Sequence, residues 1–81
     1  MFSYLDKLES LNLNHNKVIE IESMAFEKLT SLKQLNLGFN KIRILDENLF
    51  ENLKNLEQLE INNNQISKIF EATFSHLKEL K

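Results

Sequence analysis

The sequence predicts an α/β solenoid, with short parallel strands on one side and irregular or short helical returns on the other. Three observations predict this fold class. The residues Asn16, Asn40 and Asn64 are separated by intervals of 24. Apolar residues recur at the same interval, and each unit contains a short stretch in which leucine or isoleucine alternates with a polar residue, as in a half-buried strand. A fixed period of this length is typical of stacked structural repeats.

The composition limits the number of domains and the kinds of partner and site that this chain can have. A chain of 81 residues accommodates one small domain. Its formal charge of −2 provides no basic field for nucleic acid, so we expect no nucleic-acid partner. Cysteine is absent, which excludes disulfides and thiolate metal sites. No apolar run exceeds three residues, and we therefore expect neither a transmembrane segment nor a signal peptide in this chain.

The units follow one another without insertion. Counted from Leu8, apolar residues occupy positions 1, 4, 6, 11, 14, 19 and 22 of every full unit. We expect a single array without capping modules, which suggests a piece of a longer protein. Its parts are a partial repeat at 1–7, full repeats at 8–31, 32–55 and 56–79, and the start of a further repeat at 80–81.

Strands are predicted around 11–13, 35–37 and 59–61, where apolar and polar residues alternate. Apolar residues also occur at every third position from Phe26 to Leu35, a spacing that allows a helix. At about 100° per residue, however, such a series drifts around the helix instead of forming one face. The asparagine-rich stretches are poor helix interior, because their side chains compete for backbone hydrogen bonds. A helical turn is expected only near the phenylalanine of each unit.

Asparagine closes each predicted strand, at Asn16, Asn40 and Asn64. The sharp turn there leaves main-chain groups without a ladder partner, and each unsatisfied buried group costs about 1–3 kcal/mol. The asparagine side chain carries both an acceptor and donors, so we expect it to bond its own turn and the next one.

Phenylalanine recurs on the return side at the same interval. Phe2, Phe26, Phe50 and Phe74 are expected to stack into a spine. Terminal repeats normally present a polar outer face. Here the ends carry apolar residues that we expect to be half-exposed and to favour end-to-end self-association: Phe2, Leu5, Phe74, Leu77 and Leu80.

The pattern L-x-x-L-x-L-x-x-N-x-I-x-x-I-x-x-x-x-F-x-x-L-x-x, over the whole chain, resembles the 24-residue "typical" class of leucine-rich repeats. The chain is similar to the ectodomain repeats of Toll-like receptors and insect leucine-rich immune proteins. The resemblance implies a right-handed leucine-rich repeat solenoid and a protein-interaction module of a secreted or cell-surface protein, with no enzymatic activity and no cofactor. Three departures stand out: cysteine-rich caps and N-glycosylation sequons are absent, and Glu22, Asp46 and Phe70 occupy a position that is often proline in this class.

The resemblance also implies that partners dock on the concave strand face. Phe39 is the one apolar ring expected there, and it either contacts the partner or pads a neighbouring turn. A strip of three strands covers roughly 240 Å², well below the roughly 800 Å² of a standard interface. The expected contact residues are Glu9, Asn12, Asn14, His15, Lys33, Gln34, Asn36, Phe39, Glu57, Gln58, Glu60 and Asn62.

The sequence is compatible with several functions. The partner is expected to be a protein or peptide, with a glycan or lipid as further ligand classes. The alternatives are spacer repeats of a larger receptor and an intracellular, cytoplasmic scaffold. No metal site is expected, because His15 and His76 occupy different positions of the repeat. Ser10, His15 and Asp6 lack a nucleophile elbow, and catalysis is not expected.

Overall fold

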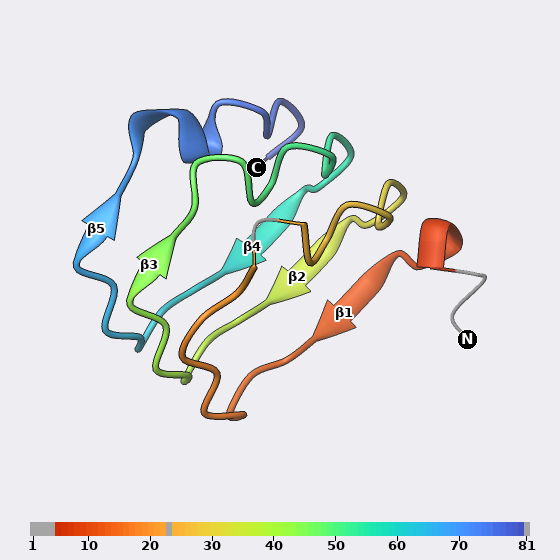
Figure 1. Cartoon of the computed structure of the whole chain (residues 1–81). Coiled ribbons are helices and arrows are strands. Elements are labelled where there is room, and N and C mark those ends of the chain that lie inside the picture. The colour runs from red at the N-terminus through yellow and green to blue at the C-terminus, as the bar shows by residue number, and fades with distance from the viewer. Residues whose placement is uncertain (1–4, 23, 81) are drawn as a thin grey trace.

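The computed structural model describes residues 5–22 and 24–80. The chain winds in successive turns, with three strands on one side and two shorter strands on the other (Figure 1). In chain order the elements are the 3₁₀-helix η1 (Leu5–Lys7), the strands β1 (Ser10–Asn12), β2 (Gln34–Asn36), β3 (Ile44–Leu45), β4 (Gln58–Glu60) and β5 (Lys68–Ile69), and the 3₁₀-helix η2 (Glu71–Phe74).

The strands β1, β2 and β4 form a parallel sheet in which residues 24 positions apart are paired. Leu11 pairs with Leu35, and Leu35 pairs with Leu59. Hydrogen bonds between neighbouring turns continue past the strand ends, for example from the N–H of Phe39 to the carbonyl of Asn62 at 2.9 Å. The predicted stacking of equivalent residues on adjacent parallel strands is confirmed.

A second, two-stranded parallel sheet lies on the return side and was not predicted. In it Ile44 pairs with Lys68, and Leu45 pairs with Ile69. Two residues per strand are too few to show an alternating pattern, so the sequence offers little signal for this sheet. It links only the second and third units. In the first unit, the carbonyl of Ile19 accepts a hydrogen bond of 3.4 Å from the N–H of Arg43.

The core consists of the repeated apolar positions, and the middle unit is the most deeply buried. Leu35 is 1% exposed, whereas its counterparts Leu11 and Leu59 are only half-buried. Leu49, which belongs to none of the predicted apolar columns, is also buried, at 2% exposure. Because a buried leucine contributes about 1.5–3 kcal/mol, most of the stabilisation is concentrated where a unit has neighbours on both sides.

The phenylalanine spine is confirmed for the three described members. The rings of Phe26 and Phe50 have centroids 6.5 Å apart, and those of Phe50 and Phe74 are 5.9 Å apart. Phe2 lies outside the described residues. The expected helical turn forms beside Phe74, in η2, whereas Phe26 and Phe50 lie in hydrogen-bonded turns.

The apolar ends agree with the prediction in part. Leu5 and Phe74 are half-buried and Leu80 is 42% exposed. The prediction for Leu77 was wrong, because this side chain is only 7% exposed and belongs to the same apolar cluster as Leu53. No helix among residues 5–22 and 24–80 is long and apolar enough to cross a membrane.

Candidate functional site: the strand face

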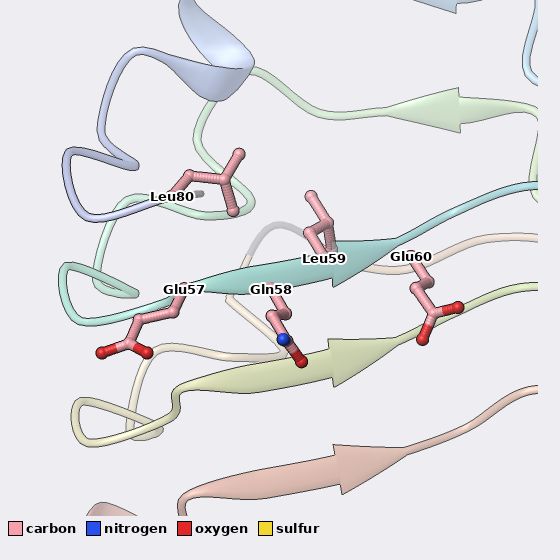
Figure 2. A pocket seen from close by; sticks show the side chains of 5 residues that line it. All are labelled: Glu57, Gln58, Leu59, Glu60 and Leu80. Carbon is pink, nitrogen blue, oxygen red and sulfur yellow. The ribbon is translucent and has the colours of Figure 1, made fainter.

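The polar side chains of β1, β2 and β4 form one surface, here called the strand face. Leu11, Leu35 and Leu59 turn toward the core, and the flanking residues of each strand turn away from it. Those residues border a shallow hollow of about 160 Å³. In Figure 2, Gln58 and Glu60 extend from β4 on the side nearer β2, while Leu59 extends in the opposite direction. The strand face consists of Ser10, Asn12, Gln34, Asn36, Gln58 and Glu60.

Two asparagines of this face are fixed by hydrogen bonds to their own backbone. Asn12 Oδ1 accepts from the N–H of Asn14 at 3.1 Å, and Asn36 Oδ1 accepts from the N–H of Gly38 at 2.9 Å. These bonds form short turns of the kind that asparagine favours. They leave the Nδ2 group, with its two N–H donors, on the other branch of each side chain. Glu60 of β4 is paired in register with Asn36, so Asn12, Asn36 and Glu60 form one row across the three strands.

After each strand, the residue that precedes the repeated asparagine (Asn16, Asn40 or Asn64) adopts a left-handed backbone conformation. The φ angles are 60° for His15, 54° for Phe39 and 58° for Asn63. Asparagine tolerates this region, whereas a bulky residue is strained there. The Phe39 ring is 47% exposed and stacks on His15, with ring centroids 4.5 Å apart and planes 7° apart. Phe39 therefore pads the neighbouring turn while keeping an exposed area.

Gly38 directly precedes Phe39 and is buried. A Cβ at Gly38 would lie 2.8 Å from Asn62 Oδ1 and 3.2 Å from Asn36 Oδ1. The absence of a side chain thus lets the two neighbouring amides approach the backbone. The sequence contains a signal for this close approach, because Gly38 is the only glycine of the chain.

A second hollow, of about 460 Å³, lies along the outer edge of β4 and is lined by Glu57, Gln58, Leu59, Glu60 and Leu80 (Figure 2). Its lining combines two carboxylates with two leucines. It shares Gln58 and Glu60 with the strand face, so the two hollows meet at β4.

The predicted contact residues separate into three groups. Those bordering the strand-face hollow are Asn12, Gln34, Asn36, Gln58 and Glu60, and Ser10 joins them. Those on the turns after the strands are Asn14, His15, Phe39 and Asn62, and those preceding the strands are Glu9, Lys33 and Glu57. All twelve predicted residues are exposed or half-buried.

The asparagine column holds the turns together, but in the direction opposite to the predicted one. Asn40 is 6% exposed, and its Oδ1 accepts from the N–H groups of Asn16 and Val18 in the preceding unit. Its Nδ2 donates to the carbonyls of Leu13, Leu37 and Gly38. The side chain therefore bonds its own turn and the preceding one, because the preceding turn presents its N–H groups toward it.

Asn64 repeats this arrangement and Asn16 does not. The Oδ1 of Asn64 accepts from the N–H of Ile42 at 3.0 Å, and its Nδ2 donates to Leu37 and Ile61. Asn16 is exposed, and it joins the network through its main-chain N–H. The predicted side-chain bonds of the asparagine column are therefore present at Asn40 and Asn64, and Asn16 takes part through its main chain.

Within the described part of the chain, no group of three or more histidine or acidic side chains is arranged to hold a metal ion. His15 stacks on Phe39, and His76 lies on the turn after η2.

Comparisons with known proteins agree with this architecture. A family model described as a BspA type leucine rich repeat region, with six copies, matches residues 1–81. The chain is similar to the solved structure of a TLR13–ssRNA13 complex, with 34% sequence identity and a TM-score of 0.88. That match covers 99% of this chain and 11% of the TLR13 chain, so this chain spans about a tenth of the relative's length. The search of curated proteins returned no match. With a family model matching its whole length, the chain belongs to the leucine-rich repeat family.

Proposed function

We propose that this chain is a protein-interaction module of a secreted or cell-surface leucine-rich repeat protein, and that it binds its partner through the strand face. The observation that carries the proposal is the in-register row of polar side chains on β1, β2 and β4, which the sheet holds in fixed positions. The likeness to a Toll-like receptor supports the setting. We also propose that the solenoid is right-handed, with the strands on its concave side.

The size of the face limits how it can act. Each strand has three residues and is therefore about 10 Å long. Three such strands about 4.8 Å apart cover on the order of 150 Å², whereas a standard interface buries about 800 Å² on each partner. The partner must therefore also contact the turns around Phe39 or further repeats.

A binding test can use the 81-residue chain displayed on a bead against a panel of purified extracellular proteins. Replacing Gln34 and Gln58 with arginine places two bulky charges in the middle of the strand face, and we expect captured partners to be lost. Replacing Asn48, which lies on the return side, with arginine is the matched control. Equal capture by both variants would place the binding surface outside the strand face, and no capture by the wild-type chain would favour the spacer interpretation. Capture of cytoplasmic proteins alone would favour the intracellular scaffold.

Single-stranded RNA is a second candidate ligand, because the relative was solved as a TLR13–ssRNA13 complex. The residues on and beside the strand face oppose it, since Glu9, Glu57 and Glu60 are acidic and Lys33 is the single cation among the predicted contacts. Binding to RNA depends mainly on neutralising phosphates. We expect no anisotropy change for a labelled 13-mer RNA at physiological salt, and a salt-dependent rise would reverse this choice.

A further inference from the structure

The row formed by Asn12, Asn36 and Glu60 is organised before any ligand arrives. The Oδ1 atoms of both asparagines accept main-chain hydrogen bonds at 3.1 and 2.9 Å, which fixes the orientation of their amides. Two N–H₂ groups are thus held on adjacent strands, with a carboxylate on the third strand of the same register. Donors that are already ordered lose little entropy on binding, which favours their use as ligand contacts.

The surroundings of this row are hydroxyl and amide groups. Ser10, Gln34 and Gln58 stand in the neighbouring row of the same strands, and all three are exposed. The apolar residues bordering the hollow are Leu11 and Leu35, of which Leu35 is buried and Leu11 is half-buried. The fully buried core of a protein–protein interface is more apolar than this and is depleted in serine and in charged side chains such as glutamate. The centre of the strand face therefore suits a ligand that is itself covered with hydroxyl groups.

The spacing of the row supports the same ligand chemistry. Neighbouring strands lie about 4.8 Å apart, which is close to the length of one sugar ring in an extended oligosaccharide. Sugar hydroxyl and ring oxygens accept hydrogen bonds from amides, and a pair of adjacent hydroxyls can donate to both oxygens of a carboxylate. The exposed ring of Phe39, three residues beyond Asn36, adds a flat apolar surface on which the C–H face of a sugar can pack.

We propose that the strand face binds the carbohydrate of its partner, a neutral oligosaccharide lying across β1, β2 and β4 with about one sugar ring per strand. Asn12 and Asn36 donate to sugar oxygens through Nδ2, and Glu60 accepts from sugar hydroxyls. This inference rests on the proposed function, because it takes the strand face to be the binding surface, and it names the chemistry that the face recognises.

The experiment is a printed array of neutral, sialylated and sulfated glycans probed with the 81-residue chain. The informative variants are Asn12→Asp and Asn36→Asp, because aspartate keeps the oxygen that accepts from Asn14 or Gly38 and removes the N–H₂ donors. Asn12→Asp is the cleaner of the two, since its register partner is Asn36 and not Glu60. Asn48→Asp adds the same charge on the return side and is the matched control.

We expect binding to a set of neutral glycans, weakened about tenfold by Asn12→Asp and unchanged by Asn48→Asp, as for the loss of about one hydrogen bond. Side-chain amide NMR signals of Asn12 and Asn36 should shift when a neutral glycan from that set is titrated. The inference is overturned if no neutral glycan binds, if only sulfated or sialylated glycans bind, or if Asn12→Asp binds like the wild-type chain.

The two proposals can fail separately. Capture of an unglycosylated protein that is lost on changing Gln34 and Gln58 to arginine would keep the strand face as the binding site and overturn its carbohydrate specificity. Neutral glycans that bind with unchanged affinity after the same double substitution would instead overturn the strand face itself.

Discussion

The turns at Asn40 and Asn16 contain the same residue at the same position of the repeat, yet their structures differ. Asn40 is buried and its side chain makes five hydrogen bonds that reach into two units. Asn16 is exposed, and the backbone beside it, at Lys17, takes a positive φ of 60° that the later units do not show in their described residues. The difference shows that Asn40 acts as a link between two units, a role that the side chain of Asn16 does not share among the described residues.

Burial along the array follows the same rule. Phe50 is fully buried between two phenylalanines, whereas Phe74 has one ring neighbour and is half-buried. In a quasi-one-dimensional array each unit draws its stability from contacts with adjacent units. The comparison between middle and outer units can therefore be tested by making one substitution at two equivalent positions.

The largest expected effect is that of Asn40→Leu. The change leaves the N–H groups of Asn16 and Val18 and the carbonyl of Leu13 without their partner. At about 1–3 kcal/mol for each buried unsatisfied group, we expect a loss of about 4–6 kcal/mol in unfolding free energy, measured by urea denaturation.

Two matched variants calibrate that result. Asn36→Leu removes one accepted hydrogen bond, from Gly38, and should cost about 1 kcal/mol. Asn16→Leu removes an exposed side chain and should cost less than about 0.5 kcal/mol. Similar urea midpoints for the Asn40 and Asn16 variants would refute the distinction between the two turns.

A somewhat smaller effect is expected for the phenylalanine spine. Phe50→Ala opens a cavity between two stacked rings and should cost about 3–5 kcal/mol. Phe74→Ala removes a half-buried ring and should cost about half as much, because less apolar area returns to water. Thermal and urea denaturation of the two variants give the comparison, and equal losses would mean that the outer unit is as tightly packed as the middle one.

The smallest expected effect concerns the strained backbone at Phe39. Both Phe39→Asn and Phe39→Ala abolish the stacking on His15, so their difference reports the preference for the left-handed conformation. We expect the asparagine variant to be more stable by about 0.5–1 kcal/mol, as judged by urea midpoints. An alanine variant of equal or greater stability would show that position 39 is not strained.

Sequence reasoning predicted the parts of the fold that the 24-residue period controls. The register of Leu11, Leu35 and Leu59 and the stacking of Phe26, Phe50 and Phe74 follow directly from equivalent residues lying over one another. The pairing of Leu45 with Ile69 could not be predicted, because hydrogen bonding in so short a strand depends on where the return segments come to lie.

The candidate site shows the same limit at the level of side chains. The pattern placed Asn12 and Asn36 on an outward row, but it could not show that hydrogen bonds to Asn14 and Gly38 fix their amides. It also allowed Phe39 to contact the partner or to pad a neighbouring turn, without revealing the stack on His15 or the positive φ. These features arise from local backbone geometry, which apolar periodicity does not encode.

Amide hydrogen exchange at Val18 tests most directly whether asparagine side chains join consecutive units. The N–H of Val18 donates to Asn40 Oδ1 at 3.0 Å and therefore depends on a side chain 22 residues away. If asparagine side chains join the units, this amide is protected in the wild-type chain at a level similar to the sheet amides, and Asn40→Ser abolishes its protection while β2 and β4 remain protected. A Val18 amide that exchanges as fast as in an unfolded peptide, or that stays protected in Asn40→Ser, would show that Asn40 does not link the two turns.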